Sequence, residues 1–516
     1  MSVGRARLRA VSPRRASSLS KSRFCHGLQC LKQLWWRVHE RQAPELVPPP
    51  ALQAVFDRGS LVGERARAEF PGGTLVEGEP WAVAAKVAAT RAALAADAPA
   101  IYEASFEADG VFAAVDVLER RPDGHAIVEV KSTLEVKDQF IPDVAIQLHV
   151  ARRSGLAVAR AEVMHLDRAC RFPDLSNLFA REDVTARAEA FLPEIPAHLE
   201  RMRAALDGPL PVVATGPHCS DPYDCPFLAR CWPPLPPHHV STLFRGGRQV
   251  EALLAAGVTR LEDVPAGTPL GAAAARQVQA IQAGRVVVEG DLAGALAALA
   301  PPVAYLDFET VAPAIPAWPG CGPYQAVPVQ MSCHVATADG ALVHHAHLAA
   351  ASAGPDGPDD PRPALAAAVV SACAGAATVV AYNASFERRC LEQLAERVPA
   401  LQAPLLDVAG KLVDLLPIVR DHVYHPDFGG SFSMKAVAPA LVPGLGYAGL
   451  EIGEGGAASS ALEGLLLGGG DEPDAAVRAE LRRQLLAYCE QDTLAMVKVV
   501  EALRTLAGRW PGRRRR

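Results

Sequence analysis

The amino-acid sequence predicts a mixed α/β protein with several domains. Strand-like apolar runs such as VFAAV and VAYLDF alternate with segments whose apolar residues recur at helical spacing. Strands with intervening helices are typical of mixed sheets. The chain has 516 residues, and at ~150 residues per domain it is long enough for two to four domains. Half of its residues are apolar, which supplies sizeable cores and argues against disorder.

The sequence divides into three blocks. Residues 19–235 mix helix-like and strand-like segments and end in HCSDPYDCPFLARCWPPLPPHH, whose proline run indicates a boundary. Residues 240–295 show helical spacing, which predicts a helical connector packed on its neighbours; a helical hairpin on a nucleic-acid backbone is the alternative. Residues 300–510 begin with the strand VAYLDFET and end in a long helix, and their glycine- and alanine-rich segment 453–474 predicts a surface loop.

The charge of the chain is unevenly distributed. The net charge is -6, yet no acidic residue precedes Glu40 and residues 513–516 are all arginine. Such basic ends are compatible with phosphate contacts, and solvated tails are an equal alternative. No apolar run approaches the ~20 residues of a membrane helix, so we expect no membrane partner. The 11 cysteines are an odd number, which excludes complete disulfide pairing and favours the cytoplasm.

The segment GVFAAVDVLERRPDGHAIVEVKST predicts two strands joined by a turn at 122–124. Asp116 follows the apolar run VFAAV, while Glu129 and Lys131 are two residues apart and therefore face one side of their strand. The two strands can present two carboxylates and one ammonium group to one point. Carboxylates bind Mg²⁺ or Mn²⁺, and a nearby lysine can position water and offset phosphate charge. A hairpin with ordinary surface charges is the alternative.

The first block resembles the RecB/AddB branch of the PD-(D/E)xK nucleases, including CRISPR-associated members that carry an iron–sulfur cluster. The resemblance rests on LSKSRFCHGLQCLKQLWW, AAVDVL, IVEVKST and AIQLHVARRSG. It implies a restriction-endonuclease-like domain with metal on the two carboxylates and an active site made of Asp116, Glu129, Lys131 and Gln147. The early-helix histidine of these enzymes is missing from GSLVGERARAEF, and Glu64 or Glu103 is a candidate replacement.

Three cysteines near the end of the first block are separated by five residues each: Cys219, Cys225 and Cys231. Four thiolates can close a zinc site or an iron–sulfur cluster. In the iron–sulfur nucleases that this block resembles, one ligand lies near the N-terminus and three follow the nuclease core. The resemblance therefore implies a mainly structural 4Fe–4S cluster with Cys30 as the fourth ligand and Cys25 as a less favoured substitute. Structural Zn²⁺, with His218 as a candidate ligand, is the alternative.

Acidic residues recur in three segments of the last block. Asp307 and Glu309 are two residues apart on YLDFET and face one side of that strand. Tyr488 and Asp492 are one helical turn apart in YCEQDTLAM, and the strand in VVAYNASFE runs toward Glu387. These carboxylates can hold two metal ions ~3.5–4 Å apart for in-line attack on a phosphodiester, with the tyrosine orienting the water. One such pair is common by chance, whereas the ordered set is much less common.

The ordered set resembles the DEDD-type 3′–5′ exonucleases of the ribonuclease H-like fold over nearly all of residues 300–510. The resemblance implies catalytic metal binding by the acidic residues, with Glu387 where those enzymes normally have aspartate. Asp414 in KLVDLLPIV is a further acidic candidate, whose alternative role is a charge at a helix start. PYQAVPVQMSCHV and GGSFSMKAVAPAL also resemble an uncharacterised bacterial domain family fused behind RecB-like nucleases. There, Lys435 and Ser433 are candidates for phosphate contact, with a capped helix start as the alternative.

We therefore expect a metal-dependent nuclease with two phosphodiesterase sites. The RecB-like resemblance favours DNA ends in repair or defence as the substrate, with a helicase or other partner that the sequence does not identify. The second hypothesis is a nucleic-acid-binding scaffold with one or both sites inactive, which the missing histidine and Glu387 favour. The third is RNA as the substrate, because DEDD folds process both nucleic acids.

Overall fold

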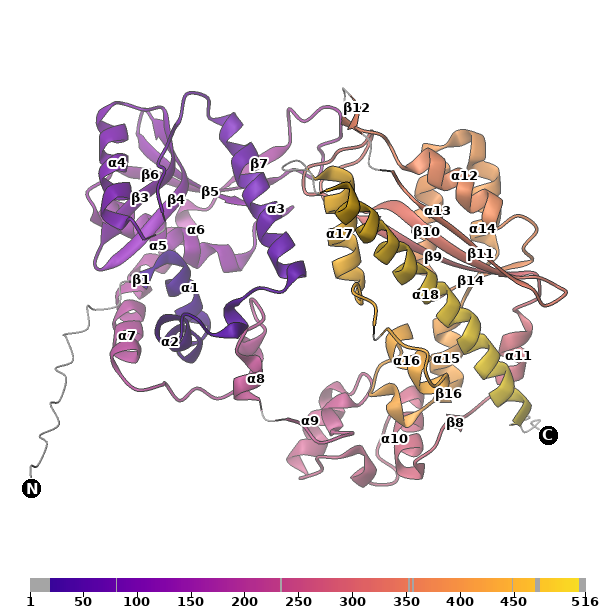
Figure 1. Ribbon diagram of the computed structural model, residues 1–516. Coiled ribbons are helices and arrows are strands. Elements are labelled where there is room, and N and C mark those ends of the chain that lie inside the picture. Colours follow the sequence, from indigo (N-terminus) through magenta and orange to yellow (C-terminus); the bar gives the residue numbers. More distant parts are fainter. Residues whose placement is uncertain are drawn as a thin grey trace, which may run out of the picture. The chain divides into compact units, whose positions relative to one another are not determined.

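The structure is a computed structural model that describes residues 19–79, 81–232, 234–350, 353–354, 357–447, 449–468 and 474–509. Of the basic residues expected to contact phosphate, those before residue 19 and the arginines at 513–516 lie outside the described residues, whereas Lys21, Arg23, Lys32 and Arg37 lie within them. The protein is a mixed α/β protein, as predicted, and it divides into two compact units, Met1–Pro234 and Leu235–Arg516 (Figure 1). None of the described helices is both long and apolar enough to cross a membrane.

The first unit is built on a mixed sheet whose described strands follow the order β2-β3-β4-β5-β6-β7, with β1 paired to β4. These strands span Leu19–Ser20 (β1), Thr74–Leu75 (β2), Ala100–Ala108 (β3), Val111–Arg121 (β4), Gly124–Lys131 (β5), Val158–Leu166 (β6) and Phe179–Asp183 (β7). β4 and β5 are antiparallel, and their connection at Pro122 and Asp123 ends on Gly124. Gly124 has a φ of 133°, which favours glycine. The hairpin predicted from the sequence is confirmed.

Helices complete the first unit. They span Lys21–Gln29 (α1), Leu31–His39 (α2), Pro50–Ala66 (α3), Val83–Ala95 (α4), Ile141–Arg153 (α5), Thr185–Phe191 (α6), Ile195–Asp207 (α7) and Leu228–Cys231 (α8). α5 contacts β3, β4 and β6, and its Val144, Ile146 and Leu148 are fully buried. Burial of each such side chain stabilises the fold by ~1.5–3 kcal/mol, so the core fixes α5, and with it Gln147, against the sheet.

The second unit is built on a sheet in the order β11-β10-β9-β14-β15. The strands span Val303–Val311 (β9), Val327–Ala336 (β10), Leu342–Leu348 (β11), Thr378–Ala381 (β14) and Leu412–Asp414 (β15). β10 is antiparallel to both β9 and β11, whereas β14 is parallel to β9 and to β15. Two short pairs lie outside this sheet: β8 (Val287–Val288) with β16 (Val423–Tyr424), and β12 (Ala353–Gly354) with β13 (Gly357–Pro358).

Helices cover both faces of this sheet (Figure 1). The helices of the second unit span Gly247–Ala255 (α9), Ala272–Ala283 (α10), Leu292–Ala297 (α11), Arg362–Ala372 (α12), Ser385–Arg397 (α13), Gln402–Gly410 (α14), Leu415–His422 (α15), Met434–Leu441 (α16), Gly455–Leu467 (α17) and Ala475–Arg509 (α18). Side chains of a strand alternate between its faces. Ala304, Leu306 and Phe308 of β9 pack with α12, α13 and α14, so the odd-numbered residues of β9 face α18.

Residues 240–295 are largely helical, as predicted, and they pack within the second unit. Leu253, Val278 and Ile281 share a hydrophobic core with Tyr424 and Phe428. β8 also pairs with β16, so hydrogen bonds as well as apolar contacts join this segment to the rest of the unit.

The prediction of a surface loop at 453–474 is wrong for most of that segment, because residues 455–467 form α17. Leu462, Leu465 and Leu466 are buried at helical spacing and pack against Leu485 of α18. The glycines that flank this apolar stripe explain why the composition indicated a loop.

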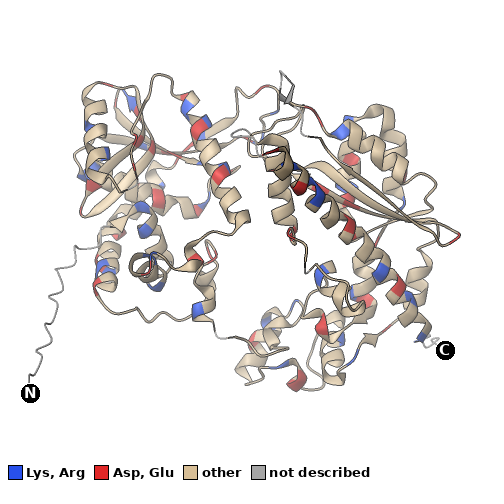
Figure 2. Ribbon diagram, in the orientation of Figure 1, with Lys and Arg blue, Asp and Glu red and all other residues tan. Residues whose placement is uncertain are grey.

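Acidic and basic residues are interspersed over the ribbons of both units, and both signs occur along α18 (Figure 2). The charge distribution alone therefore does not locate a path for nucleic acid among the described residues.

Candidate functional site

Four carboxyl groups of the second unit gather from three separate elements. Asp307 and Glu309 come from β9, and Asp492 comes from α18, which lies over the face of the sheet to which both β9 residues point. One oxygen of each of these three side chains lies within 4.8 Å of the others. Glu387, in the first turn of α13, is close enough that its charge acts on Asp307. The structure thus brings Asp307, Glu309 and Asp492 together, with Glu387 near Asp307 but outside this group of three.

The acidic cluster places several carboxyl groups close together in largely buried surroundings. Burial, Asp492 and Glu309 raise the pKa of Asp307 well above its usual range. Burial, followed by repulsion from Asp492, raises the pKa of Glu309 to about 8, and burial raises the pKa of Glu387 to about 8. Burial also raises the pKa of Asp492. Raised carboxyl pKa values at one point indicate a site where a cation would be favourable.

The residues present fit hard divalent cations. Glu387 Oε2 is buried and has no hydrogen-bond partner among the described residues. Buried carboxylate oxygens normally have a partner, so this orphaned atom indicates a missing one. Mg²⁺ and Mn²⁺ bind carboxylate oxygens and would supply that partner. The residues that would hold such ions are Asp307, Glu309, Glu387 and Asp492.

Two residues that the sequence analysis missed hold the acidic cluster in place. The hydroxyl of Tyr447 donates a hydrogen bond to Asp492 Oδ1 at 2.5 Å. The thiol of Cys489 donates to Asp307 Oδ2 at 3.4 Å. Tyr447 lies in the glycine-rich GLGYAGL, which has no periodic pattern, whereas Cys489 could have been found from its place on the inward face of α18.

Tyr488 and Lys435 border the same cluster. Tyr488 is on α18 one turn before Asp492, as predicted, and burial together with the charge of Asp492 raises the pKa of its phenol. The phenol is therefore protonated at neutral pH and can donate a hydrogen bond. Lys435 Nζ lies 5.5 Å from the ring centroid of Tyr488 and equally far from that of Tyr447. Its charge acts favourably on Glu309 and Asp492.

Asp414 and Ser433 have local positions at helix starts. Asp414 is the N-cap of α15, and its Oδ1 accepts hydrogen bonds from the backbone nitrogens of Leu416 at 3.0 Å and Asn383 at 2.9 Å. Ser433 is the N-cap residue of α16, and its hydroxyl accepts from Ser431 at 3.1 Å. Asp414 thus has the helix-start role that was its alternative interpretation.

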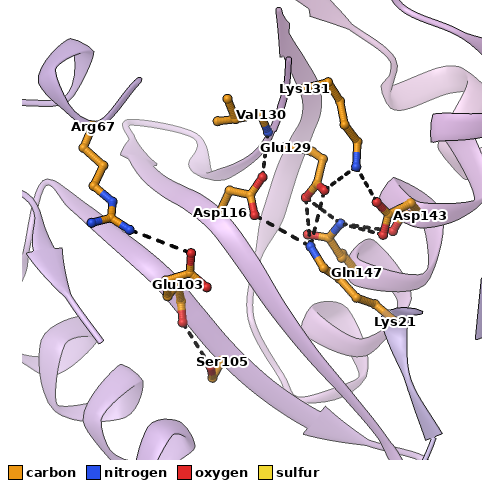
Figure 3. A network of polar contacts seen from close by, with 10 residues as sticks. All are labelled: Lys21, Arg67, Glu103, Ser105, Asp116, Glu129, Val130, Lys131, Asp143 and Gln147. Atoms are coloured by element: carbon orange, nitrogen blue, oxygen red, sulfur yellow. Dashed lines mark hydrogen bonds and ion pairs between the residues drawn. The ribbon is translucent and has the colours of Figure 1, made fainter. Parts of the chain in front are cut away.

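A polar network in the first unit contains all four residues predicted there (Figure 3). Lys131 Nζ donates to Glu129 Oε1 and to Asp143 Oδ2, each at 2.7 Å. Gln147 Nε2 donates to Glu129 Oε2 at 2.8 Å. Asp116 Oδ2 accepts from the backbone nitrogen of Val130 at 2.8 Å, which connects β4 to β5 at this point. The Oε1 atom of Gln147 is buried without a partner among the described residues.

Lys21, at the start of α1, is a member of this network that the sequence analysis missed. Its Nζ lies 3.2 Å from Glu129 Oε2 and 3.7 Å from Asp116 Oδ1, between the two carboxylates. Burial and repulsion by Glu129 raise the pKa of Asp116 to about 7, against the opposing effect of Lys21. Despite burial, Lys131 and Lys21 hold the pKa of Glu129 well below its usual range. An ammonium group therefore takes the place of a bridging cation, and metal binding here stays a prediction.

Glu103, one candidate replacement for the missing histidine, lies apart from the contacts around Glu129. Glu103 is on β3 with a φ of 56°, and its Oε1 is 4.0 Å from a guanidinium nitrogen of Arg67. Figure 3 shows this pair separated from the Lys131 and Gln147 contacts. Glu64 is exposed on α3.

The four predicted cysteines line one cavity of the first unit, together with His218: Cys30, Cys219, Cys225 and Cys231. Gln29 Nε2 donates to the backbone oxygens of His218 at 2.9 Å and Tyr223 at 2.6 Å, which ties the cysteine loop to α1. Cys25 does not line this cavity and is instead influenced by the charges of Asp143 and Lys131.

The four thiols are spaced more widely than in a closed zinc site. Among the described residues, the groups whose ligand atoms all lie within 4.8 Å of one another include no cysteine. Zn–S bonds of ~2.3 Å would place tetrahedral sulfurs ~3.8 Å apart. No three of the four thiols therefore lie as close together as in a closed zinc site, and whether the group is an iron–sulfur cluster or zinc stays a prediction.

A family comparison covers part of the second unit. Residues 304–433 match the family described as Domain of unknown function (DUF2779). The DUF2779 segment is about a quarter of the chain and contains Asp307, Glu309 and Glu387, whereas Tyr488 and Asp492 follow it. No curated protein matches the chain.

Proposed function

We propose that the chain is a metal-dependent nuclease whose principal site is formed by the DUF2779 segment and α18. The observation that carries the proposal is the convergence of Asp307, Glu309, Glu387 and Asp492. These residues come from three elements, burial raises the pKa of all four, and repulsion within the cluster adds to the rise for Asp307 and Glu309. A protein that needed only a stable core would not gather such charges, because unpaired buried carboxylates cost several kcal/mol.

Each side chain of this site has a chemical task. When bound, divalent cations offset the charge of a phosphodiester and acidify a water molecule. The four carboxylates would hold these ions. The protonated phenol of Tyr488 would orient the attacking water, and the ammonium group of Lys435 would offset the negative charge of the incoming phosphate.

Sheet topology and substrate chemistry also support the proposal. A mixed sheet with helices on both faces agrees with what the ribonuclease H-like resemblance implies. DNA is the favoured substrate because the first unit resembles RecB-like nucleases, and RNA is the alternative. The cysteines are all free, which is compatible with the cytoplasm.

The first unit would contribute a second phosphodiesterase site and a structural cluster. Asp116, Glu129, Lys131 and Gln147 already lie in one network, but a divalent ion would have to displace the ammonium group of Lys21. The cysteine cavity would hold a mainly structural 4Fe–4S cluster, with Zn²⁺ as the alternative.

The test uses the full-length protein with Mg²⁺ or Mn²⁺ on single-stranded DNA, end-bearing duplex DNA and matched RNA. In a Lys131→Met background, which removes cleavage by the first unit, Asp307→Asn and Asp492→Asn should each lower the cleavage rate by at least ~100-fold, because each removes a metal ligand. Glu392→Gln, which alters an exposed glutamate of α13, is the matched control. Lys131→Met reports separately on the first unit. Wild-type rates in both aspartate variants would refute the proposal.

A nucleic-acid-binding scaffold is the second candidate function for the first unit. The position of Lys21 between the two carboxylates favours it, since the charges there are already paired. A scaffold would bind DNA with and without metal and show no turnover in the Asp307→Asn background.

A further inference from the structure

Two histidines and a glutamate meet near the edge of the second unit's sheet. His334 of β10 and His344 of β11 are direct cross-strand partners, and their stacked rings have centroids 4.5 Å apart. Glu490 of α18 lies beside them, with Oε1 3.6 Å from His344 Nδ1. One ligand atom of each of the three residues lies within 4.8 Å of the other two. The nuclease proposal gives these residues no task.

Two buried hydroxyl groups orient the imidazole rings. Thr493 Oγ1 donates to the backbone oxygen of Glu490 at 3.1 Å. When the Thr493 hydroxyl donates to this backbone oxygen, Thr493 Oγ1 accepts from His334 Nδ1, which lies 2.8 Å away. The Nδ1 atom of His334 then carries the ring proton, and the lone pair of its Nε2 is free to bind a ligand.

The second ring is held in the same way. Ser332 Oγ lies 2.7 Å from Thr493 Oγ1 and 2.9 Å from His344 Nε2. When Ser332 donates to Thr493, it accepts from His344 Nε2, which leaves the lone pair of His344 Nδ1 facing Glu490. Histidines that bind metals usually have their other ring nitrogen fixed by such a hydrogen bond.

We propose that His334, His344 and Glu490 form a binding site for a transition-metal ion of the Zn²⁺ class. Two imidazole nitrogens and one carboxylate suit zinc, and three protein ligands leave a fourth position for water. The acidic cluster offers carboxylate oxygens, which suit Mg²⁺ or Mn²⁺ instead. Two neighbouring sites on one face of the sheet thus select different ions. This proposal does not depend on nuclease activity.

The ion would attach α18 to β10 and β11. Glu490 precedes Asp492 by two residues and Thr493 follows it directly, so the site fixes the turn of α18 that carries Asp492. β11 ends the sheet on this side among the described strands, and a metal bridge would stabilise its pairing with β10. The three ligands therefore position Asp492 without touching the substrate.

The experiment counts zinc in the full-length protein. Protein depleted with a chelator is dialysed against Zn²⁺ in millimolar Mg²⁺, and the metal per chain is measured by mass spectrometry. His344→Ala should bind one zinc ion fewer than the wild type. His345→Ala is the matched control, because His345 is the next residue of β11 and pairs with Cys333, whose side chain packs on the other face. Zinc bound by the cysteines is the same in both variants and cancels.

Two further variants keep the test decisive if His344→Ala does not fold. The Glu490 side chain is 50% exposed, so Glu490→Gln should fold normally and weaken zinc binding at this site at least ~10-fold. Thr493→Val should weaken it ~10–100-fold by releasing His334. Co²⁺ absorption in the visible range gives a second readout, since bands from this site disappear in Glu490→Gln while cobalt–thiolate bands persist. Equal zinc content and affinity in the wild type, His344→Ala and Glu490→Gln would overturn the proposal and leave an ion pair between His344 and Glu490.

Discussion

Glu309→Gln should stabilise the metal-free protein at alkaline pH. The pKa of Glu309 rises from 4.5 to about 8, so the folded state holds a proton that the unfolded state releases at lower pH. Stability contributed by this group is therefore lost as pH rises from about 4.5 to about 8, and the loss then levels off. Glutamine keeps the size of the side chain but never ionises, so the variant avoids this loss.

The magnitude follows from the pKa change. At ~1.36 kcal/mol per pH unit, a pKa raised from 4.5 to about 8 corresponds to ~5 kcal/mol. Burial is the largest cause of this rise and repulsion from Asp492 the second, and the two carboxyl groups titrate together, so we expect about half of this, ~2–3 kcal/mol, from the single substitution. For a unit of this size, such a gain raises the melting temperature by several degrees.

Differential scanning calorimetry in chelator at pH 6 and pH 9 measures the effect and separates the transitions of the two units. The difference between Glu309→Gln and the wild type should grow from pH 6 to pH 9, while Glu392→Gln should show no such change. Mg²⁺ at pH 9 should raise the wild-type melting temperature more than that of Glu309→Gln. A variant that melts at or below the wild-type temperature at pH 9 in chelator would refute the electrostatic reasoning.

Three further predictions concern single side chains. Lys21→Met removes the ammonium group between the carboxylates of the first unit. In an Asp307→Asn background, this change should raise the Mn²⁺ affinity at least ~10-fold, as measured by electron paramagnetic resonance. An unchanged affinity would contradict competition between the lysine and the metal. Tyr447→Phe removes a hydrogen bond to Asp492 worth ~1.5–3 kcal/mol, so the pKa of Asp492 should rise further. The acid limb of the pH–rate profile should therefore move to higher pH. An acid limb that does not move would argue against a role of Tyr447 in setting the pKa of Asp492. Cys219→Ser should abolish brown absorbance near ~400 nm and bound iron while leaving cleavage by the second unit intact; a colourless, iron-free wild type would exclude the cluster.

The sequence was sufficient for those parts of the fold that a short-range period encodes. The two-residue spacing of Asp307 and Glu309 predicted their shared face, and the four-residue spacing of Tyr488 and Asp492 predicted theirs. The β4–β5 hairpin followed in the same way from apolar runs that flank Pro122. In each case the residues that decide the geometry are neighbours in the chain.

Contacts between distant segments were not predictable from the same patterns. Lys21 meets Glu129 across 108 positions, and in the sequence it is one of several basic residues near the N-terminus. Tyr447 lies in a glycine-rich segment without periodicity and contacts Asp492 only through the tertiary fold. His334 and His344 are partners because β10 and β11 form an antiparallel pair whose register no single-strand pattern specifies.

The alternation of side chains along β9 limits how this chain can change in length. Inserting or deleting one residue in the middle of Val303–Val311 would turn the residues beyond that point to the opposite side, and the carboxylates would then project among the apolar side chains of α12 to α14. Two errors would arise at once, since charge would be buried in this apolar layer while Leu306 or Phe308 would leave it for the face covered by α18. Length variation among related chains should therefore be absent from this strand and concentrated in connections such as the one between β10 and β11.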